Sequence, residues 1–346
     1  DFSNLEQAEN YVESLKKAAD PASPARLAFG PRTIGYTLYP NLSGNGWGEP
    51  DERGQAVRDL NRNLDFRKAI SYALDRQRLG ESLVKGPFTT QYPGGLYAGT
   101  AFYDAASTVF YPYSVDSAKE ALKAAGLEDT DGNGFVNLPG GGDLNVTLLT
   151  QSDYATDKNL AEGVVAMMAD AGLQVTLNAL TGKDFDNARD SGKFDWIVIR
   201  NGTELITVVQ NTAALAPTGP TTDVNHRANG AGEMDLLPYE EELVKTVNAF
   251  IGSRDPAERQ ELMKTYQKLY TENLDGIGLT AYPGALIINK RFANIPAGAP
   301  IFMYNWAEDN IIRERVYVPA DAQIGAELHP NTLPGALGDA GPVTAN

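Results

Sequence analysis

The stretch LNVTLLTQSDYATDKNLAEGVVAMMADAGLQVTLNAL, from Leu144 to Leu180, decides the fold class. Residues 144–150 are apolar at alternate positions, residues 160–172 have helical periodicity, and residues 173–180 read as extended again. The apolar run FDWIVIRNG, residues 194–202, is typical of a strand that is buried on both faces. This alternation of strand and helix predicts an α/β fold with a sheet.

Helices are expected before and after this unit in the sequence. An apolar stripe predicts a helix in residues 1–20, a second helix follows an N-cap at Asp65, and a third runs from Ser114 to the stop at Gly126. The Gly/Pro/Asp-rich residues 44–54 are expected to form an exposed loop, and residues 84–114 a long irregular segment. Two later helices are expected near residues 239–250 and after Asp255.

The composition excludes several classes of function. The 346 residues allow about two domains. There are 29 basic and 45 acidic residues, a net charge of −16, without a Lys/Arg cluster, so nucleic acid and anionic membrane surfaces are poor partners. There is no cysteine, and no apolar stretch approaches the ~18 residues that membrane insertion requires. The chain starts at Asp1 without a signal peptide, so a mature, truncated or proteolysed product is expected.

The segment DTDGNGFVN resembles the first part of a calcium loop. Asp129, Asp131 and Asn133 fall on the ligand positions, and Gly134 falls on the turn position. The position of the bidentate glutamate is occupied by Gly140, so the second half of the motif is missing. We therefore expect a connecting turn, with calcium only as a weak candidate ligand, and neither a metal nor another cofactor is expected elsewhere.

The order of several motifs resembles family 5 of the bacterial extracellular solute-binding proteins. These motifs are LDFRKAISYALDRQRL (64–79), YSVDSAKEALKAAGL (113–127) with the DTDGNG turn, then AGLQVTL and FDWIVIRNGTEL. The resemblance covers roughly residues 32–318, and its most specific part is Arg67 to Arg76, which is similar to the family's RxAxxxAxDR helix. This family binds dipeptides and oligopeptides and serves ABC importers.

The resemblance implies an α/β fold like that of type II periplasmic binding proteins, in which two lobes close on a ligand. Residues 1–60 would supply the end of the N-terminal lobe, 61–288 the C-terminal α/β lobe, 289–318 a segment returning to the first lobe, and 319–346 a flexible tail. Most of the family's N-terminal lobe has no counterpart in the chain, so a fragment is expected.

The family pattern also suggests binding residues. In peptide-binding members an acidic residue shortly after the FD strand holds the peptide's α-amino group, and this pattern places Glu204 there. The alternatives for Glu204 are a solvated loop residue or a structural partner of Arg200. The family's usual aromatic residue before the acid is replaced by Asn201, which leaves room for a polar ligand.

Aromatic residues supply further candidates. Tyr92 and Tyr97, on the irregular segment, could stack on sugar rings or line side-chain pockets, and Trp306 could face either cleft or core. Trp196 is expected in the core. His226 and His329 lie in polar segments and are expected at the surface.

The sequence thus predicts a monomeric, periplasmic or extracellular binding protein that delivers an oligopeptide to the membrane permease subunits of an ABC importer. An oligosaccharide or an opine-like compound is the alternative ligand. A glycan-active hydrolase is the less favoured alternative, because no nucleophile motif, histidine cluster or distinct carboxylate pair supports an enzyme.

Overall fold

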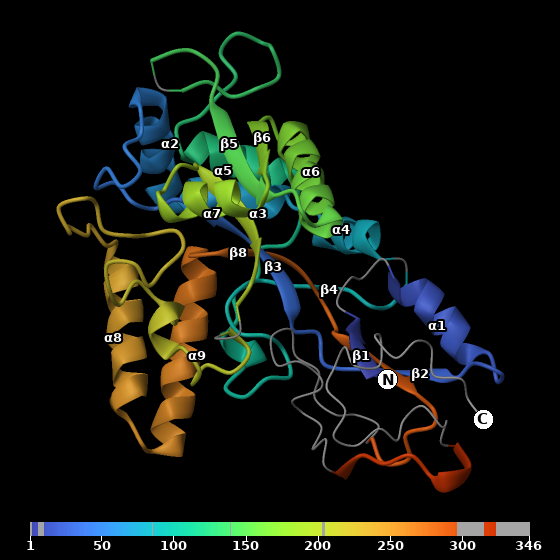
Figure 1. Ribbon diagram of the computed structural model, residues 1–346. Helices are drawn as coiled ribbons and strands as arrows, with labels where there is room; N and C mark the ends of the chain where they lie inside the picture. The colour runs from blue at the N-terminus through green and yellow to red at the C-terminus, as the bar shows by residue number, and fades with distance from the viewer. Residues whose placement is uncertain are drawn as a thin grey trace.

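The computed structural model describes residues 2–5, 10–84, 86–138, 140–202, 205–295 and 315–322. In this part of the chain, the strands form a six-stranded sheet in the order β4-β8-β3-β7-β5-β6 and a three-stranded sheet in the order β1-β9-β2 (Figure 1). The strands are β1 (Phe2–Leu5), β2 (Ala25–Phe29), β3 (Ile34–Pro40), β4 (Thr90–Gln91), β5 (Asn145–Gln151), β6 (Gln174–Leu180), β7 (Trp196–Arg200), β8 (Ile277–Tyr282) and β9 (Ala285–Asn289).

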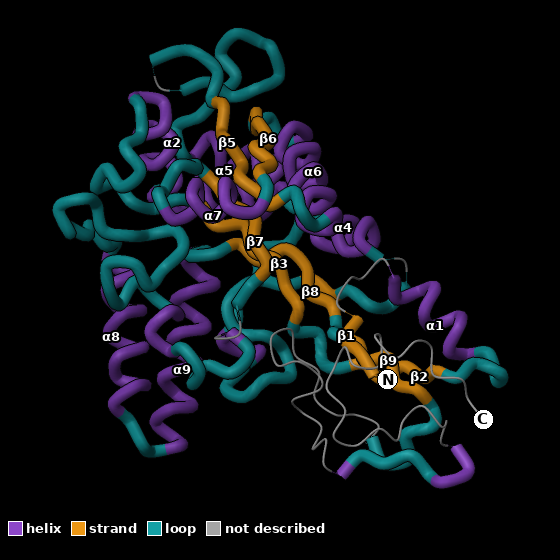
Figure 2. Tube along the Cα trace, viewed as in Figure 1, coloured by secondary structure: helices purple, strands orange, loops and turns teal. Residues whose placement is uncertain are grey.

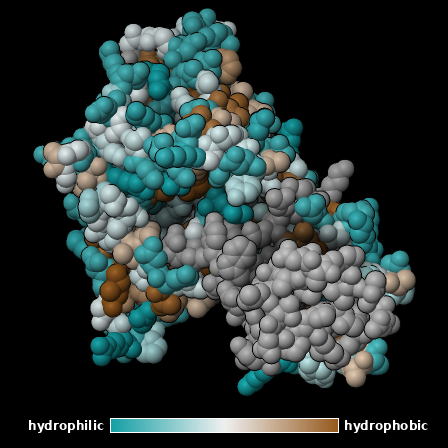
Figure 3. Space-filling model, viewed as in Figure 1, coloured by the Kyte–Doolittle hydropathy of each residue, from teal (hydrophilic) through white to brown (hydrophobic). Residues whose placement is uncertain are grey.

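The α-helices of the described residues surround the larger sheet and flank the smaller one. They are α1 (Tyr11–Ala19), α2 (Glu52–Arg62), α3 (Leu64–Ala73), α4 (Arg76–Leu83), α5 (Val115–Ala124), α6 (Ala155–Asp170), α7 (Gly182–Asp190), α8 (Pro238–Gly252) and α9 (Pro256–Asn273). On the face of the molecule shown in Figure 3, the surface outside the grey residues is mostly hydrophilic, with some hydrophobic residues at the lower left, where α8 and α9 lie.

The β-α-β unit predicted from residues 144–180 is confirmed. β5 pairs in parallel with both β6 and β7, so that Leu148 lies between Leu177 and Trp196. β3 is antiparallel to β7 and β8, and β4 is antiparallel to β8. The larger sheet is therefore mixed, with its parallel part at the end that carries β5, β6 and β7.

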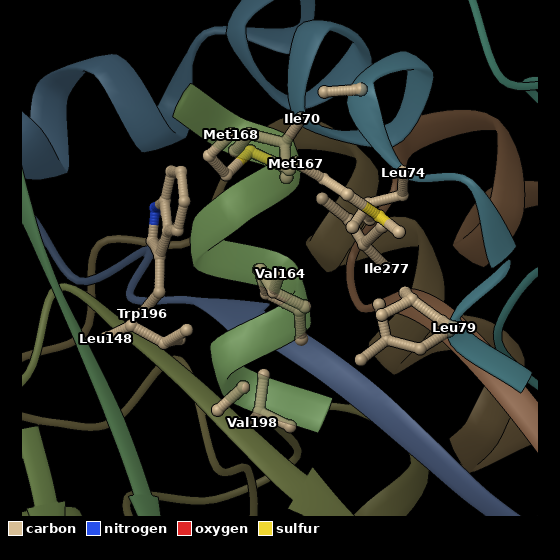
Figure 4. Packing of buried hydrophobic residues seen from close by; sticks show 14 of the residues in the cluster. Ile70, Leu74, Leu79, Leu148, Val164, Met167, Met168, Trp196, Val198 and Ile277 are labelled. Carbon is tan, nitrogen blue, oxygen red and sulfur yellow. The ribbon is translucent and has the colours of Figure 1, made fainter. Parts of the chain in front are cut away.

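The main core lies between this sheet and helices α3 to α6. Figure 4 shows the contact between α6 and strands β5 and β7, which involves the buried residues Leu148, Val164, Met167, Met168, Trp196 and Val198. Burying one such apolar side chain contributes about 1.5–3 kcal/mol. The Trp196 ring also donates from Nε1 to Asn61 Oδ1 at 2.8 Å, so the predicted core position of Trp196 is confirmed.

The second face of the sheet is covered differently. Helices α8 and α9 lie side by side as a pair (Figures 1 and 2) and enclose a smaller cluster that includes Tyr92, Tyr97, Phe250 and Tyr266. Next to it, Phe185 of α7 packs with Tyr39 and other apolar residues beneath β5 and β7. The space between these two clusters contains the candidate site described below.

Two short crossings connect the sheets. The chain passes from β2 to β3 and from β8 to β9, and the amide of Gly30 donates to the carbonyl oxygen of Gly284 at 3.0 Å where the crossings meet. β9 then pairs with β1 and β2. Of the predicted returning segment, residues 296–314 lie outside the described residues, and the predicted lobe boundaries stay predictions.

Two local expectations were wrong. The expected loop at 44–54 ends in the first turns of α2, where the Asp51 carboxylate accepts from the amide of Gly54 at 2.7 Å. The helix expected from Asp65 is capped by Asn63 and ends at Ala73. A new helix then starts at Arg76, whose buried guanidinium donates to the Gly278 carbonyl oxygen at 2.7 Å and so ties α4 to β8.

Candidate functional site

The candidate site lies where the parallel strands β5, β6 and β7 end. Their last residues are Gln151, Leu180 and Arg200, which lie at the same edge of the sheet. In open α/β sheets, ligands bind in the crevice outside the carboxyl ends of parallel strands. The residues that follow these strands are therefore the first to consider.

An exposed aromatic ring stands at this edge. Tyr154 follows β5 at the start of α6, and its side chain is 43% exposed. The guanidinium carbon of Arg200, at the end of β7, lies 5.6 Å from the centre of the Tyr154 ring. Such a cation–π contact fixes both groups without burying them. Together they offer an apolar ring face and several hydrogen-bond donors to a ligand.

The buried carboxyl of Asp157 interacts with the charge of Arg200. The Tyr36 hydroxyl donates to Asp157 Oδ1 at 2.9 Å, and Tyr36 is the register partner of Arg200 across β3 and β7. Burial raises the pKa of the Asp157 carboxyl, while the Tyr36 hydrogen bond and the charge of Arg200 act in the opposite direction. Burial is the larger effect, so the pKa of Asp157 stays raised although the positive charge of Arg200 favours its ionised form.

On the opposite face of β7, Asn201 meets two stacked tyrosines. The rings of Tyr92 and Tyr97 are 4.8 Å apart and inclined by 17°. Asn201 Nδ2 donates to the Tyr92 hydroxyl at 3.0 Å, and that hydroxyl donates to the carbonyl oxygen of Gly95. Within the described residues, Asn201 Oδ1 and the Tyr97 hydroxyl are buried without a hydrogen bond of good geometry, although the Tyr97 hydroxyl lies beside Asn201 and the backbone of Gly35. Unpaired buried polar atoms are costly, and they are typical of positions that a ligand or water completes.

Two cavities adjoin the hydrogen bond between Asn201 and Tyr92. One, of about 500 Å³, is lined by Tyr92, Tyr97 and Tyr103, among others. The other, of about 250 Å³, is lined by Asn201 and by residues of β3, β7 and α9. The site can thus receive polar groups and apolar ring faces on both sides of β7.

The structure places four of the six predicted binding residues. Arg200 and Asn201 lie at the strand end, and Tyr92 and Tyr97 lie beside Asn201. Glu204 and Trp306 lie outside the described residues. The ligand-binding role of all six stays a prediction. Sequence reasoning missed Tyr154, although its position shortly after a strand of the parallel sheet was a usable signal.

The expectation for His226 was wrong, because its side chain is fully buried. Its ring nitrogens lie 2.7 Å from Glu240 Oε1 and 2.8 Å from Asp235 Oδ1. Burial disfavours the charged imidazole, but the hydrogen bonds to Asp235 and Glu240 outweigh it and raise the pKa of His226 to about 9. His226 thereby ties the loop before α8 to that helix. His329 lies outside the described residues.

The DTDGNG segment forms a tight turn held by its own carboxylates. Asp129 accepts from the amides of Gly132 and Gly134 at 2.7 and 2.9 Å, and Asp131 accepts from the amide of Asn133. These backbone hydrogen bonds, that of Gly134 first, lower the pKa of Asp129. Among the described residues, no group of three or more His, Asp or Glu side chains is placed to hold a metal ion.

Comparison with known proteins agrees with this geometry. Residues 4–221 match the family model described as bacterial extracellular solute-binding proteins, family 5 Middle. The chain belongs to this family. Because the family is extracellular and a relative is periplasmic, the expected location outside the cytoplasm is confirmed. No helix in the described part of the chain is long and apolar enough to cross a membrane.

Two relatives are similar over almost the whole family 5 chain. It is 62% identical to the periplasmic alpha-galactoside-binding protein of Rhizobium meliloti (strain 1021), covering 99% of this chain and 50% of that protein. It is 60% identical to the periplasmic binding protein MelB of Agrobacterium fabrum C58, solved in complex with stachyose, with a TM-score of 0.89 and coverage of 97% and 51%. The chain thus spans about half the length of the relatives it matches.

A more distant structure shares the fold. The oligopeptide-binding protein OppA is 18% identical, with a TM-score of 0.71 and coverage of 90% of this chain and 51% of that one. The predicted fold, that of type II periplasmic binding proteins, is confirmed by these structures and by the mixed sheet.

Proposed function

We propose that this family 5 chain takes part in binding an oligosaccharide of the α-galactoside type for uptake by an ABC importer. The observation that carries the proposal is the identity of 62% and 60% to two proteins whose names refer to alpha-galactosides and stachyose. Identity to the oligopeptide-binding protein OppA is only 18%. An oligosaccharide, which was the alternative ligand from the sequence, is therefore preferred to a peptide.

The chemistry of the strand end supports a neutral, hydroxyl-rich ligand. A sugar presents an apolar ring face, which can stack on Tyr154, and hydroxyl groups, which can accept from the Arg200 guanidinium. Asn201 replaces the aromatic residue that is usual in peptide-binding members, and its unpaired Oδ1 can accept from a hydroxyl.

Membrane permease subunits are the proposed partners, because family 5 proteins serve ABC importers. Binding is proposed to occur without turnover, since the site offers no activated nucleophile beside a base in the described residues. Stachyose recovered unchanged by chromatography after long incubation is the expected result. Release of a smaller sugar would contradict this part of the proposal.

Native mass spectrometry of the natural full-length protein, purified without unfolding, tests the ligand class. We expect a bound mass that corresponds to a neutral oligosaccharide built from hexoses. A bound peptide, or a bound opine such as agropinic acid, would contradict the proposal.

A further inference from the structure

The smaller cavity of the candidate site lies beneath β7. It has a volume of about 250 Å³ and lies between the sheet, the residues that follow β7 and helix α9. Six residues define its chemistry: Tyr39, Asn201, Asp223, Tyr266, Tyr270 and Asp275. It therefore combines aromatic rings with two carboxyl groups and an amide.

Three polar side chains of this cavity, Asn201, Asp223 and Asp275, keep an oxygen without a hydrogen bond to a described residue. Asn201 is 2% exposed, and its Oδ1 has no hydrogen-bond partner within the described residues. Asp223 is 8% exposed and Asp275 is 2% exposed. Asp223 Oδ1 accepts from the amides of Val224 and Asn225, and no donor among the described residues reaches its Oδ2.

Asp275 likewise has one carboxyl oxygen with a hydrogen bond and one without. Its Oδ1 accepts from the Tyr239 hydroxyl at 3.1 Å, and within the described part of the chain its Oδ2 also takes no hydrogen bond. Neither Asp223 nor Asp275 forms an ion pair with a described residue, although the charge of His226 favours the ionised form of Asp223 and that of Arg67 the ionised form of Asp275. Among the described residues, neither Oδ2 is one of the fully buried side-chain atoms without a partner, so both remain accessible to a ligand that supplies hydroxyl donors.

The size of the cavity limits what can enter. A volume of about 250 Å³ is of the size that suits one pyranose ring. The larger cavity of about 500 Å³ lies on the other side of the hydrogen bond between Asn201 and Tyr92, and the two cavities have no lining residue in common. A bound oligosaccharide would therefore place a single ring in the smaller cavity.

The charges of the lining favour a neutral ligand over a cation. The side chains of Arg189 and Arg227 line the same cavity as the two aspartates. Both guanidinium groups already pair with Asp190, Arg189 at 3.0 Å and Arg227 at 3.3 Å. A metal cation would therefore meet two fixed positive charges in the wall, whereas a sugar can donate to the carboxyls and stack on the tyrosine rings.

We propose that this cavity is a subsite for a single pyranose ring at one end of the bound oligosaccharide, with Asn201, Asp223 and Asp275 accepting from its hydroxyl groups. This inference rests on the proposed function. The rings of Tyr39, Tyr266 and Tyr270 exclude water around the sugar.

Calorimetric titration of the natural full-length protein with stachyose at pH 7.5 tests the subsite through two variants. Ala214→Phe fills the cavity, because Ala214 lies in its wall on the short 3₁₀ helix Thr212–Leu215. Asp223→Asn replaces one acceptor oxygen by a donor while an oxygen remains for the two backbone amides. Each variant is expected to reduce the affinity for stachyose at least tenfold.

The matched control is Ala213→Phe. Ala213 lies on the same 3₁₀ helix but outside the cavity lining, so this variant should bind stachyose like the unchanged protein.

Folding is checked by the melting temperature of each variant without ligand. If Ala214→Phe and Asp223→Asn both bind stachyose with unchanged affinity, the subsite is wrong while the proposed function stands. If Ala214→Phe does not fold, the affinity of Asp223→Asn alone decides. If the unchanged protein does not bind stachyose, the proposed function and the subsite both fail.

Discussion

Asn201 donates from Nδ2 to the hydroxyl of Tyr92 at 3.0 Å, and this bond joins the end of β7 to the segment after β4. The two residues are 109 positions apart in the sequence, and both are buried. The bond therefore holds the irregular tyrosine-rich segment against the sheet, with Asn201 in the lining of one cavity and Tyr92 in the lining of the other.

Substitution of Asn201 by alanine should destabilise the protein. The Tyr92 hydroxyl would keep its bond to Gly95 but lose the donor from Asn201, which costs roughly 1–2 kcal/mol for a buried hydrogen bond. Urea denaturation measures the free energy of unfolding. Asn187→Ala, on the exposed surface of α7, is the control and should change it by less than about 0.5 kcal/mol. Equal effects of the two substitutions would show that the bond adds no stability.

Substitution of Tyr154 by alanine should weaken sugar binding without unfolding the protein. The side chain is 43% exposed, so it contributes little to the core, but its ring is the proposed stacking surface beside Arg200. Loss of an aromatic contact of about 1 kcal/mol corresponds to roughly a fivefold lower affinity. Titration with stachyose measures it. Tyr113→Ala, at a side chain that is 49% exposed and precedes α5, serves as the control. An unchanged affinity of Tyr154→Ala would remove Tyr154 from the site.

Stability should fall as the pH rises from neutral to alkaline values. The pKa of His226 is raised to about 9 in the folded protein, above its ordinary value of 6.5, so the folded state binds the proton more tightly. The resulting stabilisation is fully present below pH 6.5 and is lost as the pH rises through 9. Since one pKa unit corresponds to ~1.4 kcal/mol, the loss amounts to about 3 kcal/mol.

The pH dependence can be checked by urea denaturation at intervals between pH 6 and pH 9.5. Asp223 acts in the same direction at lower pH, because burial first of all raises the pKa of its carboxyl to about 6. The variant His226→Gln, which cannot be protonated, should flatten the slope above neutral pH. A slope that is the same in both proteins would show that His226 is not its source.

Calcium should not stabilise the folded protein. The carboxylate of Asp129 already accepts from the amides of Gly132 and Gly134, and Gly140 stands where a calcium loop has its bidentate glutamate. The Tm measured with millimolar calcium should equal the Tm measured with a chelator, and magnesium is the control for ionic effects. A large increase with calcium alone would reverse this conclusion, because a ligand bound only by the folded state must stabilise it.

The local pattern of apolar residues was sufficient to predict many of the helices and strands. The apolar run of β7 and the helical periodicity of α6 both result from burial against neighbouring elements, so composition and spacing record them. α2 was missed because few of its residues are apolar, and its start depends on the capping bond between Asp51 and Gly54. Polar helices of this kind carry little periodic signal.

The site was predicted only in part, because its contacts join distant segments. Arg200 and Asn201 could be placed from the strand that precedes them. The burial of His226 could not, since its partners Asp235 and Glu240 lie nine and fourteen positions later without a motif. The smaller cavity likewise brings together Tyr39, Asp223 and Asp275 from separate parts of the chain. Such juxtapositions depend on tertiary packing.

Parallel calorimetric titrations of the natural full-length protein with stachyose and with a tetrapeptide test whether the ligand is an oligosaccharide. We expect saturable binding of stachyose and no heat of binding from the peptide. Saturable binding of the tetrapeptide, with none of stachyose, would contradict this expectation.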